Sequence, residues 1–225
     1  MSGFFQQLDT SVLTDALRNI IPAILCIPLH ELSHGFVALK LGDRTAKNAG
    51  RLTMNPLKHV DIFGLICMAV FRFGWAKPVP VDMRNFRNPK RGMALTALAG
   101  PVSNVLFCLV LLFLFGLLAP FLGSGSVGTF FLDLISTTAV LSISLAVFNV
   151  IPVPPLDGSK VLFSLLGDRA YKFILRYERY GMLLLIVLLT SGVLSGPMNR
   201  AVSFLLDRFS FLIDAGYRLG LLLKY

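Results

Sequence analysis

Residues 93–122 read MALTALAGPVSNVLFCLVLLFLFGLLAPFL and contain no charged side chain. A helix needs about 20 predominantly apolar residues to cross the hydrocarbon core of a bilayer. This segment exceeds that length, and the uncharged loop 123–126 follows it. We therefore predict a membrane-spanning helix at 93–122.

Other apolar segments lie on both sides of this helix. Residues 12–41 precede it, and residues 127–150 and 180–194 follow it. The last apolar segment, 201–223, carries charged residues, so it either spans the bilayer or lies on its surface. The patch 62–73 is too short to span and is expected to be re-entrant or interfacial. The pattern predicts an all-α multi-pass membrane protein with about five to six transmembrane helices.

The composition also indicates a membrane protein. Of the 225 residues, 55% are hydrophobic and 15% are charged, whereas roughly 25% of the residues in a soluble domain are charged. These values argue against disorder, an ordinary cytosolic enzyme and a nucleic-acid partner, although the formal net charge is +9. The basic residues concentrate in 40–91 and 169–179, which places both segments on the cytoplasmic side. The cysteines are expected to be small buried hydrophobes: Cys26, Cys67 and Cys108.

The connection 44–92 has a mixed character and is expected to be cytoplasmic or re-entrant. Its segments 50–53 (GRLT) and 74–81 (GWAKPVPV) look like short strands punctuated by Gly and Pro. We therefore expect a small β element within this connection. The chain 1–225 is otherwise expected to form a single integral-membrane domain.

The segment His30-Glu31-Leu32-Ser33-His34 indicates a metal site. Residues four apart lie on one face of a helix, about 6 Å apart along its axis. Two imidazoles at this spacing can bind one Zn²⁺, and Glu31 would lie beside the metal to accept a proton from water. The chain contains only three His, and ionisable residues inside a membrane helix are costly. Both facts favour a functional site over a polar cluster without metal.

Two histidines leave a catalytic zinc short of one protein ligand. The candidate for the third ligand is Asp157, in the segment 149–158 (NVIPVPPLDG). Its prolines force an irregular backbone at the membrane boundary, which is tolerated where it is buried in protein or lines a wet cavity. The alternative is that Asp157 only caps a short helix at 156–166.

These motifs resemble the site-2 protease family of intramembrane zinc metalloproteases, whose signatures are His-Glu-x-x-His and a later Asn-x-x-Pro-x-x-x-Leu-Asp-Gly. Three further segments are similar to the same family: 50–56, 74–81 and 99–104. The resemblance covers about 25–165 and indicates a compact prokaryotic-type member without a PDZ-like or CBS-like domain. It implies one zinc per chain, with His30, His34 and Asp157 as ligands and Glu31 as general base.

The resemblance implies a zinc metalloendopeptidase of the cell membrane with its active site toward the cytoplasm. Such an enzyme cleaves peptide bonds in or near transmembrane segments of membrane proteins, for regulated intramembrane proteolysis or clearance of membrane peptides. Its partners would be these substrates and the lipid bilayer. The alternative is a membrane metal-binding or transport protein that uses the same His and Asp side chains as a transit site. Glu31 separates the two, because a transit site does not need a carboxylate poised on water.

Several other polar groups have two interpretations each. Asn149 would either donate to the oxyanion of the reaction or hold the turn before Asp157. The two strand-like segments would either pair with an extended substrate or cover the site. His59 would bind a second partner or the nearby backbone, and the backbone is favoured. Asp133 would be a relay group or a carboxyl satisfied near the outer interface, and the latter is favoured.

Overall fold

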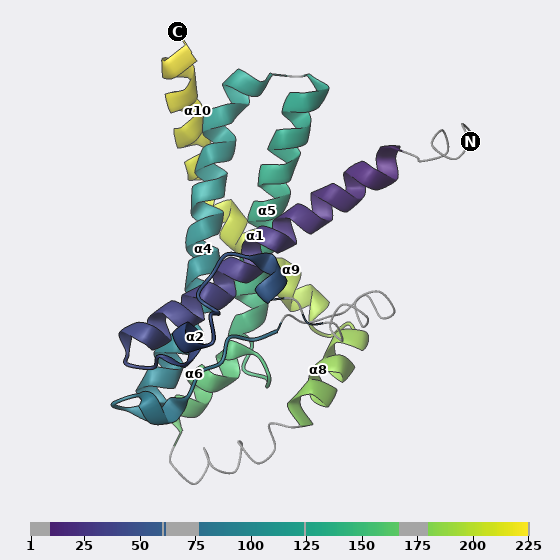
Figure 1. Ribbon diagram of the computed structural model, residues 1–225. Helices are drawn as coiled ribbons and strands as arrows, with labels where there is room; N and C mark the ends of the chain where they lie inside the picture. The colour runs from purple at the N-terminus through teal and green to yellow at the C-terminus, as the bar shows by residue number, and fades with distance from the viewer. Residues whose placement is uncertain (1–9, 60, 62–76, 124, 167–179, 225) are drawn as a thin grey trace, which may run out of the picture.

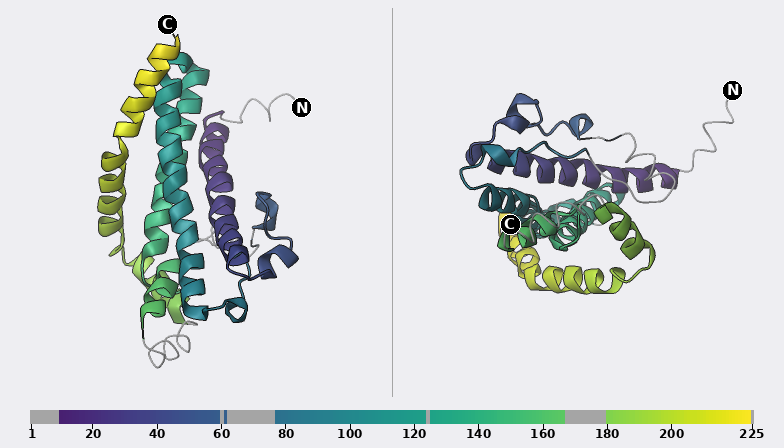
Figure 2. Two further views of the ribbon diagram at one scale, coloured as in Figure 1. Left: turned by 90° about the vertical axis from the view of Figure 1, so that its left-hand side faces the viewer. Right: turned by 90° about the horizontal axis from the view of Figure 1, so that it is seen from below.

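The computed structural model describes residues 10–59, 61, 77–123, 125–166 and 180–224, which form helices and their connections (Figure 1). The helices are, in chain order, α1 (Thr10–Lys40), α2 (Thr45–Asn48), the short 3-10 turns η1 (Pro56–Lys58) and η2 (Met83–Asn85), α4 (Pro89–Leu122), α5 (Ser126–Val150), α6 (Asp157–Leu165), α8 (Gly181–Thr190), α9 (Ser195–Phe209) and α10 (Phe211–Lys224). Helices α4 and α5 lie side by side, and α1 crosses both obliquely (Figures 1 and 2).

Three of the described helices are long and apolar enough to cross a membrane. They are the Ile20–Lys40 part of α1, with 21 residues, α4, with 34, and α5, with 25. The predicted span at 93–122 thus lies within a longer helix that begins at Pro89. Asn88 ends the preceding loop, and its side chain accepts a hydrogen bond from the Arg91 N–H as an N-cap.

The described residues hold fewer candidate spans than the five to six expected for the whole chain, parts of which lie outside the described residues. Helix α8 has ten residues, which at about 1.5 Å per residue is half of a bilayer core of about 30 Å. Helix α8 is long and apolar enough to span only when it is combined with Ser195–Lys224. The two parts lie at an angle of 84° to each other. The described residues therefore hold three candidate spans, or four if this bent pair is one. The patch 62–73 and residues 74–76 lie outside the described residues.

The prediction of a small β element is wrong for the described part of the chain, where no residue is in a strand. Segment 77–81 has two prolines, which cannot donate to a ladder. The Lys77 N–H donates to the backbone carbonyl of His59 at 2.8 Å, and further backbone groups are bonded to side chains. The Val79 N–H donates to Glu31 at 2.8 Å, and the Arg51 guanidinium donates to the Lys77 carbonyl at 2.7 Å. These contacts take the place of the neighbouring strand that the sequence had suggested.

Helix α4 is at the centre of the packing, in contact with α1, α5, α6 and α10. The buried cluster at its middle consists of Cys108, Leu111, Leu112, Ala139 and Ile143. Cys26 and Cys108 are free and buried, as expected, while Cys67 lies outside the described residues.

Small residues let α10 approach the second half of α4 closely. A Cβ added at Gly116 of α4 would lie 2.0 Å from the carbonyl oxygen of Ile213, and one at Gly216 of α10 would lie 2.3 Å from that of Phe113. Glycines at such contacts are typical of membrane helix pairs, in which van der Waals packing drives association.

Candidate metal centre

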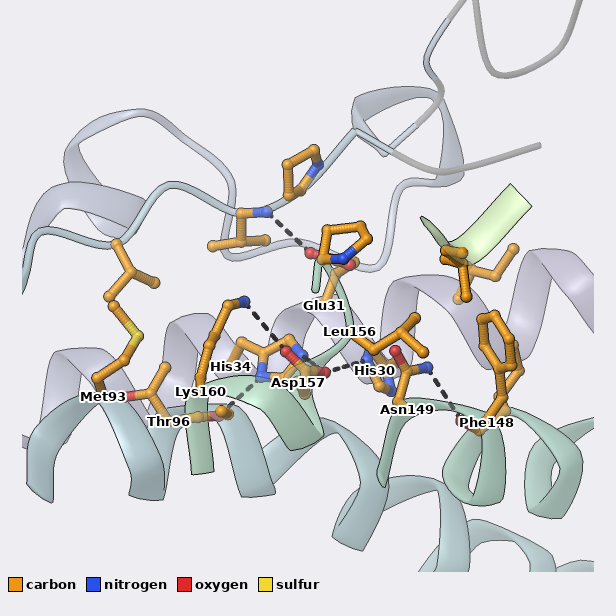
Figure 3. A pocket seen from close by; sticks show the side chains of 18 of the residues that line it. His30, Glu31, His34, Met93, Thr96, Phe148, Asn149, Leu156, Asp157 and Lys160 are labelled. Carbon is orange, nitrogen blue, oxygen red and sulfur yellow. Dashed lines mark hydrogen bonds and ion pairs between the residues drawn. The ribbon is translucent and has the colours of Figure 1, made fainter. Parts of the chain in front are cut away.

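His30, His34 and Asp157 meet at one point between α1, α4 and α6 (Figure 3). The Asp157 Oδ2 atom lies 3.1 Å from His30 Nε2 and 3.0 Å from His34 Nε2. The two imidazole rings face each other edge-on with centroids 4.6 Å apart. All three side chains are buried, and their ligand atoms lie within 4.8 Å of one another. The structure therefore brings together the three residues that the two sequence motifs singled out.

Asp157 reaches this point because the chain turns sharply between α5 and α6. Asp157 is the first residue of α6, and its side chain makes no cap, so the alternative of a purely capping role does not describe it. Gly158 makes the turn possible, since a Cβ there would lie 2.0 Å from the Val150 carbonyl oxygen.

Both oxygens of the Asp157 carboxylate have partners: Oδ2 contacts the two imidazoles and Oδ1 contacts Lys160. Burial opposes its ionisation, but hydrogen bonds from His30 and His34 and the charge of Lys160 keep the pKa of Asp157 well below its usual range. Lys160 Nζ lies 3.2 Å from Oδ1, the oxygen that faces away from the imidazoles. Sequence reasoning missed Lys160, although its position three residues after Asp157 places it on the same face of α6.

Glu31 lies beside the cluster and borders a cavity of about 490 Å³. Its carboxylate accepts a hydrogen bond from the backbone N–H of Val79, in the segment that passes over the site. The cavity has mostly apolar walls. Its apolar lining residues include Ile27, Val79, Val81, Met93, Leu145, Phe148, Met182 and Leu185. Glu31 and the three residues of the His–Asp cluster line this one cavity together.

Asn149 is half-buried at the end of α5 and lines the same cavity. One of its amide hydrogens donates to the Leu145 carbonyl at 3.0 Å, one turn earlier in the helix. A side-chain amide has two N–H groups, so this bond leaves both interpretations of Asn149 open.

Two other polar residues from the sequence analysis lie away from the cluster. His59 Nε2 is 2.9 Å from the Thr53 carbonyl oxygen within the 44–92 connection, so the predicted backbone partner is confirmed. Asp133 is an exposed residue of α5 and does not line the cavity.

The residues present fit zinc. Two imidazole nitrogens and one carboxylate oxygen are a donor set of catalytic zinc sites, which keep a further position open for water or substrate. The ring atom His34 Nδ1 lies 2.7 Å from the Thr96 carbonyl oxygen, and His30 Nδ1 lies 3.2 Å from the Asn104 amide. These contacts to Nδ1 leave the Nε2 atom of each ring facing the point shared with Asp157. The described residues thus present three converging donor atoms, and Glu31 lies next to them.

Comparisons with known proteins lead to the same chemistry. The sequence profile of peptidase family M50 matches residues 123–191. YwhC of Bacillus subtilis, named as a candidate zinc metalloprotease, is 39% identical over 203 residues, which are 85% of this chain and 90% of YwhC. Two proteins named Rip2, also candidate zinc metalloproteases, are more distant. The one from Mycolicibacterium smegmatis is 28% identical over 87% of this chain and 76% of its own length, and the one from Mycobacterium tuberculosis (strain H37Rv) is 26% identical over 82% and 71%.

No solved structure matches the chain significantly. The likeness to YwhC extends over most of both chains. On this likeness the chain belongs to peptidase family M50, the site-2 protease family, and is a zinc metalloprotease.

Proposed function

We propose that this protease hydrolyses peptide bonds in or near the membrane-spanning segments of other proteins. The observation that supports this most is the position of the cluster. His30 and His34 lie inside the apolar span of α1, and their Nδ1 partners lie on the apolar span of α4. A site between two such helices faces substrate segments at the depth of the membrane.

In this proposal, His30 and His34 bind one zinc through Nε2, and Asp157 binds it through Oδ2. When bound, zinc acts as a Lewis acid that polarises a carbonyl oxygen and lowers the pKa of water toward about 7. Lys160 pairs with the second carboxylate oxygen and so holds the plane of the Asp157 carboxylate.

Glu31 is the proposed general base. It accepts a proton from the attacking water, whose oxygen forms a bond to the carbonyl carbon of the scissile peptide. The C–N bond then breaks, and Glu31 returns the proton to the leaving amine. The hydrogen bond from Val79 orients the Glu31 carboxylate for both transfers.

Asn149 is the proposed oxyanion donor. Its amide group uses one hydrogen on the Leu145 carbonyl and has a second for the developing negative charge on the substrate oxygen. The apolar cavity walls favour hydrophobic side chains next to the scissile bond, as membrane segments provide.

The proposed orientation is a multi-pass protein of the cell membrane with its site toward the cytoplasm. Helix α1 ends at Lys40, and α4 begins beside Lys90 and Arg91, on the side where the basic connection 44–92 lies. The positive-inside rule assigns this side to the cytoplasm. The packing of α1, α4, α5 and α6 on one another supports a single domain.

The test is proteolysis by purified protein in liposomes. A labelled peptide containing a transmembrane segment should be cleaved by the wild type, and a zinc chelator should stop the cleavage. Glu31→Gln should remove cleavage while its zinc content stays at the wild-type level, because the amide cannot accept the proton. Equal cleavage by both proteins would overturn the proposal. Zinc transport that survives Glu31→Gln, without cleavage by either protein, would support the metal-transport alternative instead.

A further inference from the structure

One face of α4 lies under both imidazoles. It presents Thr96, Gly100 and Asn104, which are spaced by four residues and therefore stack along the helix. A Cβ added at Gly100 would lie 2.5 Å from atoms of both His30 and His34, so only a glycine lets the two rings rest on the helix. The rings on α1 and this face of α4 thus form one unit.

Thr96 determines the tautomer of His34. The backbone carbonyl of Thr96 lies 2.7 Å from Nδ1, and a carbonyl oxygen only accepts hydrogen bonds. In the zinc-bound ring the proton of His34 therefore resides on Nδ1, which leaves the Nε2 lone pair for the metal at the point shared with Asp157. A metal-binding histidine needs this arrangement, in which the second nitrogen donates to an acceptor.

Asn104 occupies the equivalent place beside His30. Its amide group lies 3.2 Å from His30 Nδ1, and the residue is fully buried, at 0% exposure. The amide oxygen Oδ1 has no hydrogen-bond partner among the described residues, which is unusual for a buried acceptor. A half-turn about the Cβ–Cγ bond exchanges the positions of Oδ1 and Nδ2, and places this acceptor at His30 Nδ1.

We propose that Asn104 is a positioning residue for zinc, which accepts the Nδ1–H of His30 at Oδ1 and thereby keeps the Nε2 lone pair available to the metal. This inference rests on the proposed zinc ligation by His30. Thr96 and Asn104 then act alike, one through its backbone carbonyl and the other through its side chain. A single helix fixes the tautomer and the plane of both histidines.

The test compares two substitutions of Asn104 in purified protein by competition with a zinc chelator. Asn104→Leu keeps the approximate size but removes the acceptor, and it should weaken zinc binding about 10- to 100-fold, the usual effect of losing such a partner. Asn104→Asp keeps an acceptor oxygen and should bind zinc within about threefold of the wild type, or more tightly. Equal weakening by Leu and Asp, or wild-type affinity in Asn104→Leu, would overturn the inference.

Ser142→Ala is the matched control. The Ser142 hydroxyl donates to the backbone carbonyl of Asn104 at 2.8 Å and touches neither imidazole. Its loss should leave the zinc affinity unchanged. A loss of zinc affinity as large as that of Asn104→Leu would show that loosening this turn of α4 is enough to weaken zinc binding, and it would overturn the inference. A wild-type protein that binds no zinc would instead refute the proposed function itself.

Nitrogen NMR provides a second readout that also serves if Asn104→Leu does not fold. The chain has three histidines, so histidine-selective ¹⁵N labelling gives three assignable rings. His59 is the internal reference, because its Nε2 donates to the Thr53 carbonyl. In zinc-loaded protein, Asn104→Asp should shift the His30 Nδ1–H resonance downfield, since a charged acceptor strengthens the hydrogen bond. An unchanged His30 resonance would overturn the inference.

Discussion

The two halves of α4 have different contacts: the first half contacts the imidazoles and the second half packs against other helices. The first half carries Thr96, Gly100 and Asn104 toward α1, where polar groups contact the imidazoles. The second half carries Cys108 and Gly116 toward α5, α9 and α10, where the contacts are mainly apolar surfaces and close backbone approaches. Both halves use glycine for close approach, but Gly100 makes room for the imidazoles of His30 and His34 and Gly116 makes room for α10. Substitutions in the first half should therefore change zinc binding, and those in the second should change stability.

The largest expected effect is that of Gly100→Ala. The added methyl would push both His30 and His34 away from α4, and zinc affinity should fall by at least about 100-fold, more than for a single lost partner. Gly196→Ala is the control, because a Cβ there meets nothing within 4 Å. Chelator competition on both variants measures the effect. Wild-type zinc affinity in Gly100→Ala would contradict the claim that the first half of α4 positions the two imidazoles.

Gly116→Ala tests the second half. The added Cβ would overlap the Ile213 carbonyl and separate α10 from α4, which should lower the free energy of unfolding by about 1–3 kcal/mol. The zinc affinity of the folded fraction should stay as in the wild type. Denaturant titration in detergent gives the stability, with Gly125→Ala as control because its Cβ would lie in open space. A loss of zinc without a loss of stability would contradict the assignment of this half to packing.

Lys160→Met should have a smaller effect that falls on catalysis. The substitution removes the ammonium group that pairs with Asp157 Oδ1, while Oδ2 stays next to the imidazoles. We expect zinc to remain bound and kcat/KM to fall about tenfold, as for the loss of a partner that orients a ligand. Lys224→Met is the matched control, since Lys224 donates to the Pro120 carbonyl at the far end of α4. Equal kcat/KM values for Lys160→Met and Lys224→Met would show that Lys160 does not contribute to catalysis.

The smallest expected effect is the loosening at low pH of the turn that Asp43 holds near the end of α1. Burial opposes ionisation of Asp43, but hydrogen bonds from Thr45, Asn85 and the Asp82 N–H keep the pKa of Asp43 below its ordinary value of 3.8. A lowered pKa stabilises the folded state above pH 3.8, and this contribution is lost as the pH falls further through the folded pKa. Asp43 ties the turn at Asp82 and Asn85 to the end of α1.

Amide hydrogen exchange measures this loosening. Protection of residues 82–85 should be the same at pH 7 and pH 5 and should decline below pH 3.8, whereas protection of 108–116 should not follow the same course. An Asp43→Asn variant should reduce the pH dependence of 82–85, and the part that remains comes from Asp82, whose pKa is lowered to about 2 by its hydrogen bonds with Arg84. Undiminished protection of 82–85 in the wild type at pH 2.5 would contradict the role of Asp43.

The His–Asp cluster was predictable from sequence because its signals are local. His30 and His34 are four residues apart on a helix, and Asp157 follows a proline-rich break that no membrane helix can continue through. Asn104 was visible as a polar residue in an apolar run, but its partner lies on another helix. Thr96 acts through its backbone, which leaves no mark in the sequence.

The predicted strands failed for a different reason. The segment 74–81 looks like a short strand, but its described part contains two prolines and is bonded to the side chains of Glu31 and Arg51 and to the His59 carbonyl. The apolar segments 180–194 and 201–223 have the composition of spans, yet the first forms a ten-residue helix. Length and bending depend on tertiary packing, which hydropathy does not record.

The central claim is that residues from α1 and α6, more than a hundred positions apart in sequence, form one zinc site. Metal analysis of purified protein tests it most directly, with wild type, Asp157→Ala and Asp133→Ala prepared in parallel. Asp133 is the control because it is an acidic residue of α5 that does not line the cavity. We predict one zinc per chain in the wild type and in Asp133→Ala, and a sharp loss of zinc in Asp157→Ala. Full zinc occupancy in Asp157→Ala would contradict the account.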